Sequence, residues 1–352
     1  MKRLFIVASM AIMVVGCQKT TIENEVLTQI GFNTEVGKQT RAIVDNVYDE
    51  EEKFGVYSFA WQDGDDLNTV MNNEEIAKRK TSADGVTPET YAWKATTPYY
   101  WPNDANTTLN FYAYSPKSIA AQMATEGTMT LTEWEHLQAN INTLDFMVAT
   151  PVTGATYANP DGNVATTSDV KGKVPVVFNH QMTQVIFVVK SNLTDNNVAF
   201  TLNSIKVKHV TSKANFSSNC TDNVVTNWSK VDEGEYTIFP VGTQTATAIS
   251  AEGITTTAAT MIPQDLIATV KTGDTVTTQG QQFEVQYTIS GTGVAHETVT
   301  KTIDLKAGTV ATWAPNKKVI YTLTVGLQEI TFEPTVTGWD ATAVESGNIS
   351  IN

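Results

Sequence analysis

The sequence predicts an all-β protein built from β-sandwiches, with little helix. Apolar and polar side chains alternate along many short segments, a pattern that places one face of a strand against a core. Threonine, which favours strands, is abundant within and between these segments. Turn-forming residues gather between them, as in Asn159–Gly162, Lys271–Asp274 and Ser290–Gly293. Many short strands separated by turns are typical of β-sandwiches.

The expected strands are taken from this alternation. The clearest pattern covers residues 283–289, 299–305 and 319–325. Each of these segments is as long as a typical strand of a globular protein. Further strands are expected at residues 54–61, 109–114, 145–149, 184–190, 200–210, 236–239 and 330–336.

Helix is expected at two places, residues 72–80 and 132–140, each long enough for about two turns. Thr132 is a candidate helix cap because Glu135 follows three residues later, as in a capping box. The two short helices leave the predicted fold class unchanged.

The first residues carry an export signal. Basic side chains precede an apolar run over residues 4–15, which is too short to cross a bilayer comfortably. Gly16 and Cys17 follow directly, an order that resembles a bacterial lipobox. In such a signal Cys17 is acylated and residues 1–16 are removed, and several acyl chains make a firm anchor. An ordinary signal peptide followed by a chance cysteine is the alternative.

Composition limits the partners. The formal net charge is −14, which argues against nucleic acid or an anionic membrane surface as a partner. Cys220 is the only cysteine besides Cys17. Once Cys17 is lipidated no intramolecular disulfide can form, so the fold depends on its apolar core.

The sequence shows no convincing set of catalytic or metal-binding residues. The four histidines are scattered, and none has another His or a Cys at metal-ligand spacing. Nucleotide-binding and nucleophile motifs are absent. Glu133–His136 places acids beside a histidine, but an exposed helix is the favoured interpretation, and Asp63–Asp66 lacks the spacing of a calcium loop. We therefore expect no enzyme activity, no cofactor and no metal.

A polar stretch divides the chain. Residues 150–173 are rich in glycine and other turn formers, and the apolar pattern resumes at Val174. We expect a first domain over residues 42–172 and a second over residues 173–352. Each is large enough for its own core.

Several segments together resemble a known family. Each one is a loose motif, and their order and number carry the resemblance. The segments are Trp93, residues 97–102, 109–116, 145–149 and 177–185, and the stretch from Trp313 to Trp339. They resemble the fimbrillin-like (Mfa-like) lipoproteins of Bacteroides-type bacteria over roughly residues 50–340, nearly the whole mature chain.

This resemblance implies a fold and a role. The fold would be two transthyretin-like β-sandwich domains in tandem. Family members are structural subunits of type V pili, or their anchors or tips, and reach the outer membrane as lipoproteins. An arginine-specific surface protease removes the lipidated segment, and another pilus subunit donates a strand to the groove that opens. A membrane-anchored lipoprotein, either a pilus anchor or a tip adhesin that binds a glycan or host ligand, is the alternative function.

The segment that such processing would remove covers residues 17–41. It contains one good strand over residues 26–36. Taking this strand away would unpair its neighbours and uncover an apolar floor that recruits another strand. If the segment stays in place, it is an ordinary first strand. The side chains expected to fill the floor are Val26, Ile30, Phe32 and Val36.

The expected cleavage point is the bond between Arg41 and Ala42. Arg41 lies in a polar connector directly after the strand, and Ala42 begins a new apolar segment. After Arg3 the only other arginine is Arg79, within a basic run. An arginine-specific protease therefore has few competing targets.

The donated strand is expected near the C-terminus. Residues 330–339 form the better strand but could be a fixed part of the second sandwich. The tail beyond Trp339 has sparse apolar residues, Val344, Ile349 and Ile351. A tail that is frayed or docked on its own domain is the alternative.

An aromatic cluster offers a second kind of site. Trp93, Tyr99, Tyr100 and Trp101 could stack on a glycan if their rings were exposed. Core filling and packing around the neighbouring prolines is the alternative.

Overall fold

The computed structural model confirms the all-β fold class. Cys17, Val26, Arg41, Ala42 and Cys220 lie outside the described residues. Within the described residues, no helix combines the length and apolar character needed to cross a membrane. The structure describes residues 28–36, 48–62, 65–84, 86–125, 127–164, 171–193, 197–219, 225–293, 296–306, 310–326, 330–339 and 349–351.

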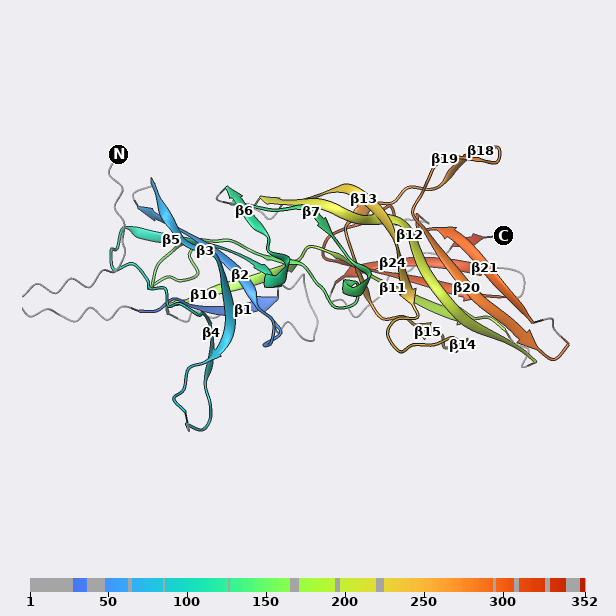
Figure 1. The fold of residues 1–352 in the computed structure, drawn as a ribbon, viewed down its shortest axis with the longest axis horizontal. Helices are drawn as coiled ribbons and strands as arrows, with labels where there is room; N and C mark the ends of the chain where they lie inside the picture. Colours follow the sequence, from blue (N-terminus) through green and yellow to red (C-terminus); the bar gives the residue numbers. More distant parts are fainter. Residues whose placement is uncertain are drawn as a thin grey trace, which may run out of the picture.

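The first half of the molecule is a sheet that closes on itself (Figure 1). Strands β2 and β5 pair along their whole length, from Gly55↔Tyr114 to Gln62↔Thr107, which joins one side of the sheet to the other. The result is a ring of strands around a single apolar core. In spatial order the strands are β2 (Phe54–Gln62), β3 (Asp65–Lys80), β4 (Tyr91–Ala95), β1 (Gly31–Val36), β10 (Lys173–His180), β8 (Met147–Ala149), β5 (Thr107–Ser115) and β9 (Val152–Ala155).

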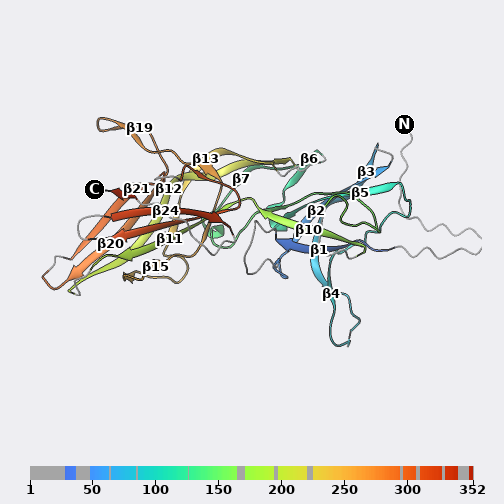
Figure 2. The same cartoon turned by 180° about the vertical axis from the view of Figure 1, so that it is seen from behind.

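The second half is a sandwich of two larger sheets, seen from both sides in Figures 1 and 2. One sheet contains β15 (Ile254–Thr255), β11 (Thr183–Ser191), β23 (Lys317–Val325), β24 (Ile330–Gly338) and β25 (Ile349–Ile351), with β16 (Ala259–Met261) beside β11. The other contains β21 (Glu297–Asp304), β20 (Gln282–Gly291), β12 (Val198–Asn219), β7 (Thr128–Glu135) and β6 (Gln122–Thr125), with β13 (Val225–Phe239) and β14 (Thr247–Ile249) beside β12.

Two small ribbons complete the second half. β17 (Gln264–Asp265) pairs with β22 (Thr312–Trp313). β18 (Val270–Thr272) and β19 (Thr275–Thr278) form a hairpin that projects from the body (Figure 1).

The core of this sandwich follows the alternation predicted from the sequence. Every second side chain is buried between the sheets along β11, in β20 from Phe283 to Tyr287, and in β23 from Val319 to Val325. Phe187 stacks on Tyr321 at 5.2 Å and lies 5.3 Å from Phe283, so the facing sheets interlock through aromatic rings. Trp313 donates its indole N–H to the Tyr321 hydroxyl at 2.8 Å, which satisfies both polar groups inside the core.

The two halves share strands and a buried cluster. β6 and β7, from the first half of the chain, extend a sheet of the second sandwich, because β7 pairs with β12 and β6 pairs with β7. β10, which begins at the expected domain boundary, belongs to the ring, and the chain enters the sandwich between His180 and Thr183. The apolar side chains that meet here, named the junction cluster, include Tyr57, Tyr112, Tyr114, Met129, Leu131, Phe146, Met182, Ala214, Phe216 and Trp339.

The two predicted helices are strands instead. Residues 72–80 form the second part of β3, which pairs with β2 on one side and β4 on the other. Their polar, helix-favouring composition is overridden because both backbone edges find partners. Thr132 lies within β7, opposite β12, and caps no helix. Within 132–140 the helical part is a single 3₁₀ turn, Gln138–Asn140.

Candidate functional site

The first strand closes the ring. β1 lies between β4 and β10, runs parallel to β10 from Gly31↔Lys173 to Val36↔Phe178, and is antiparallel to β4 at Phe32↔Trp93. Its backbone therefore joins two strands that would otherwise be neighbouring edges. The pairing with β10 is the longer of the two, so β10 sets the register of β1.

Two side chains of this segment enter the core. Ile30 and Phe32 are each 2% exposed. The Phe32 ring meets Phe54 edge-on at 5.9 Å and Phe111 at 6.1 Å. Aromatic edge contacts of this kind add to the free energy of burial. Phe32 thus fills a slot whose walls come from β2 and β5, on the far side of the ring.

The residues before β1 are fixed by backbone hydrogen bonds. The amide of Ile30 donates to the carbonyl of Tyr99 at 2.8 Å, and Trp101 donates to Thr28 at 3.0 Å. Gly31 then donates to Gly172 at 3.1 Å. The backbone of this segment therefore bonds first to the stretch before β5 and then, a few residues later, to β10.

Trp101 stabilises the place where the backbone changes its hydrogen-bond partner. The Trp101 indole N–H donates to the carbonyl of Gly172 at 3.2 Å, and its ring lies 5.9 Å from Phe111. Gly172 has a φ of +77°, which L side chains rarely adopt, so a glycine is required there. The sequence marked Gly172 as part of a polar linker; the positive φ and the contact with Trp101 emerge only in the fold.

A second buried ring was missed by the sequence interpretation. Tyr48 stacks on Phe178 at 4.9 Å, and its hydroxyl shares a 2.7 Å hydrogen bond with Ser115. Burial raises the pKa of the Tyr48 hydroxyl well above its usual range, so it stays protonated. The only signal in the sequence is an aromatic residue directly before an acidic run.

This geometry gives β1 two properties. It supplies core side chains, since burying Ile30 and Phe32 stabilises the fold by about 3–6 kcal/mol as an upper estimate. It also covers the edges of β4 and β10, which would otherwise present unpaired backbone groups. Large alternate core side chains and backbone pairing at a sheet edge are the two features by which proteins recognise an added β-strand.

A family model described as fimbrillin-like matches residues 40–339. The chain belongs to the fimbrillin-like family. The match covers both halves of the fold and begins just before Arg41, so β1 lies outside it.

Solved structures share the fold of this fimbrillin-like protein. A fimbrial protein of Bacteroides vulgatus matches with a TM-score of 0.57 and 17% identity, over 89% of this chain and 99% of that one. A protein of Bacteroides uniformis described as a candidate for cell adhesion matches with a TM-score of 0.52 and 18% identity, over 88% and 98%. At such identities the likeness concerns the fold alone. No match is found among curated proteins.

The aromatic cluster of this fimbrillin-like protein does not form an exposed platform. Trp93 is 8% exposed and Trp101 is 2% exposed, both within the core of the ring, and Tyr99 is half-buried. Tyr100 is 44% exposed. The two indole rings are therefore closed to a stacked sugar, and core filling, the alternative stated above, is what their burial favours.

Arg79, the other arginine that the protease could cut after, lies within strand β3. Arg79 pairs with Ala92 of β4 in register, and its guanidinium donates to Thr96 Oγ1 at 2.7 Å and to the Lys94 carbonyl at 3.3 Å. Glu75 is 3.6 Å away. A protease needs an extended, accessible backbone, so this position is shielded while the ring is folded.

The two C-terminal segments that could be the donated strand, β24 and β25, differ in how firmly they are paired. β24 pairs with β23 along its whole length, from Val325↔Ile330 to Lys317↔Gly338, and is a fixed strand of the sandwich. Within the part of the chain that the structure describes, β25 pairs only with the outer edge of β24, at Ile330↔Ile351 and Phe332↔Ile349. The tail thus adds a short strand at the margin of its own sandwich.

The histidines have structural environments. His180 and Asp145 share a 2.6 Å hydrogen bond, and the imidazole stacks on Trp339 at 4.4 Å. His136 is buried and packs against the rings of Trp134 and Tyr236. Among the described residues, no group of three or more His, Cys, Asp or Glu side chains is arranged to hold a metal.

Proposed function

We propose that this protein is a structural subunit of a cell-surface fimbrium that assembles by donor-strand exchange, with β1 as the strand that is replaced. Membership of the fimbrillin-like family supports a fimbrial subunit. The observation that carries the exchange step is the position of β1, which closes the ring with buried side chains and pairs with a strand on each side.

Export and release follow from the N-terminal segment. Acylation of Cys17 would hold the new subunit at the outer membrane. Cleavage between Arg41 and Ala42 by an arginine-specific protease would then separate residues 17–41, lipid included, from the body. The matched family region, residues 40–339, leaves out β1, which supports treating residues 17–41 as a segment separate from the body.

The geometry of β1 defines the strand that would replace it. A donor in the same seat must run parallel to β10 and antiparallel to β4. It must carry large apolar side chains at alternate positions, with a ring or branched residue in the slot between Phe54 and Phe111. Head-to-tail donation of this kind is heterologous, so it builds open filaments.

The tail is the proposed donor. β24 is held by β23 along its whole length, whereas β25 is bound only at one edge. Releasing β25 breaks few hydrogen bonds and leaves the sandwich intact, because β24 retains its pairing with β23. We assign donation to the chain beyond Trp339 and a fixed role to β24.

Replacing Arg41 with lysine is expected to abolish assembly, because an arginine-specific protease does not cut after lysine. Arg79→Lys is the matched control, and it should be processed like the wild type because that site is shielded within β3 and β4. N-terminal sequencing of the surface form and an undenatured gel report cleavage and polymer formation. Wild-type subunits should begin at Ala42 and form a ladder, and Arg41→Lys should remain monomeric.

Assembled wild-type material that still contains residues 17–41 would overturn the exchange proposal. It would favour the alternative, a permanently lipid-anchored subunit that acts as a pilus anchor or tip adhesin. The same N-terminal sequence therefore separates the two functions: Ala42 for a released subunit, acylated Cys17 for an anchored one.

Deleting residues 340–352 is expected to leave the folded subunit stable but unable to donate. The reason is that β25 contributes pairing only at the edge of β24. The truncated subunit should still accept a strand, so mixing it with processed wild type should shorten the polymers in proportion to its share. Polymers of unchanged length, with the truncated chain incorporated throughout, would place the donor elsewhere.

A further inference from the structure

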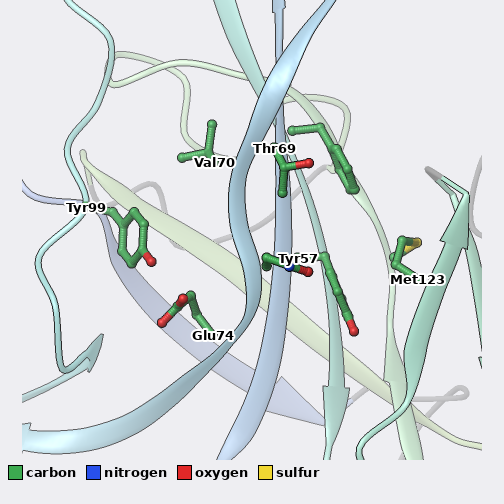
Figure 3. Close-up of a pocket in the computed structure, with 8 residues that line it drawn as sticks. Tyr57, Thr69, Val70, Glu74, Tyr99 and Met123 are labelled. Atoms are coloured by element: carbon green, nitrogen blue, oxygen red, sulfur yellow. The ribbon is translucent and has the colours of Figure 1, made fainter. Parts of the chain in front are cut away.

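A hollow of about 330 Å³ opens where β2 and β3 meet β6 and the segment before β5 (Figure 3). It coincides with an irregular part of the sheet. The β2–β3 register shifts between Val56 and Ser58 and again between Ser58 and Phe59. β3 carries the extra residues at both shifts, which makes it the bulged strand.

The bulges turn polar side chains of β3 toward the hollow. Asn73 has a φ of +57°, a conformation that costs energy for a residue other than glycine. Thr69, Asn72 and Glu74, on either side of it, line the hollow. Bulges often re-aim side chains beside binding sites, and strained backbone persists where the surroundings fix it.

Aromatic rings form the other walls. Tyr57 and Phe59 project from β2, and Tyr99 lies beside Glu74 in Figure 3. The Tyr57 hydroxyl donates to the carbonyl of Ala121 at 3.0 Å, so this ring cannot swing away. Burial, together with the neighbouring Glu74 carboxylate, raises the pKa of Tyr99 to about 12. The walls are therefore in place before any ligand arrives.

We infer that this hollow binds a neutral saccharide unit. Ring faces favour the apolar C–H face of a sugar, and the amide of Asn72, the hydroxyl of Thr69 and the carboxylate of Glu74, which all line the hollow, suit its hydroxyls. An anionic ligand would meet the carboxylate of Glu74 at close range. A purely apolar ligand would bury that carboxylate without a partner, which is costly.

The size and location agree with this ligand class. The volume lies near the lower end of the range for small-molecule sites, roughly 300–1,000 Å³. Asn72 and Thr69 are exposed on β3, so a ligand can enter from solvent. The Tyr99 carbonyl accepts the Ile30 amide at 2.8 Å, so the wall is anchored by the segment before β1. The site is therefore best tested in the chain that retains this segment.

Saturation-transfer NMR on the unassembled, unprocessed chain tests the site. The probes are the methyl glycosides of galactose and glucose, N-acetylglucosamine, N-acetylneuraminic acid as the anion and spermidine as the cation. We expect transfer to at least one neutral sugar and none to the anion. Asn72→Ala should weaken that binding by about fivefold to tenfold, the loss of one hydrogen bond.

A steric pair of variants localises the binding. Thr69→Trp should fill the hollow and abolish transfer. Thr300→Trp, the same change at an exposed position of β21, should leave transfer unchanged. Circular dichroism confirms that each variant is folded. Absence of transfer to every neutral sugar, preference for spermidine or for the anion, or binding that survives Thr69→Trp would each overturn the inference. None of these outcomes depends on filament assembly.

Discussion

Replacing Phe32 with alanine is expected to lower the free energy of unfolding by about 3–5 kcal/mol, the usual cost of removing a buried phenylalanine. The ring lies between Phe54 and Phe111 and is 2% exposed, so its removal leaves a cavity that rigid strands on both sides cannot close. Urea unfolding followed by tryptophan fluorescence measures the loss, because Trp93 and Trp101 lie in the same core.

Asn33→Ala is the matched control for this variant. Asn33 is the next residue of β1 and points to the other face of the strand, where it is half-buried. We expect a change within about 1 kcal/mol there. Equal urea midpoints for the two variants would mean that the slot contributes nothing to the seating of β1, and the strand-replacement proposal would lose its energetic basis.

Acidification from pH 7 to pH 4 is expected to cost about 3 kcal/mol of stability through His136 alone. His136 is 1% exposed, and its Nε2 donates to the carbonyl of Thr260 at 2.8 Å. Its Nδ1 has no hydrogen-bond partner within the described residues. Burial lowers the pKa of the imidazole from 6.5 to about 4, because the charged form would lie between apolar rings such as Trp134.

The sign of the effect follows from proton uptake. Above pH 6.5 the imidazole is neutral in both folded and unfolded chains, so its contribution to stability is fully present. Between pH 6.5 and about 4 the unfolded chain binds a proton that the folded chain excludes, and stability falls. Below about pH 4 both states are protonated and the loss levels off.

His136→Gln isolates this contribution, because glutamine keeps an N–H donor near the position of Nε2 but does not titrate. The wild type should lose about 3 kcal/mol more than this variant between pH 7 and pH 4, as measured by urea unfolding at each pH. His209→Gln serves as the control because the His209 side chain is 39% exposed, against 1% for His136. Identical losses in the wild type and His136→Gln would show that another group causes the acid sensitivity.

The strands of the second sandwich were predictable from sequence because each has one face in the core. Along β20, the buried Phe283, Val285 and Tyr287 alternate with polar residues, as the sequence shows directly. This alternation shows which side chains of a strand are buried, even when the strand that pairs with it is unknown. The same reasoning placed Ile30 and Phe32 on one face of the first strand, and both are buried.

The failures came where partners outside the segment decide the structure. Residues 72–80 have a polar, helix-favouring composition, yet both edges of β3 are paired, and the bulges there position Thr69, Asn72 and Glu74. For Trp93 and Trp101 the sequence favoured packing in a core but left a surface role open. Their burial depends on the closure of the ring, which local sequence does not encode.

The sequence by itself determined the all-β class, the strand faces and the resemblance to fimbrillin-like proteins, because these depend on patterns within short segments. Tertiary structure alone decided that β1 lies between β4 and β10, that β10 stays with the ring and that β7 joins the other half. The physical reason is that side-chain alternation records which face of a strand is buried. The strand that pairs with each edge is set by backbone hydrogen bonds between distant segments, which leave no such pattern in the sequence.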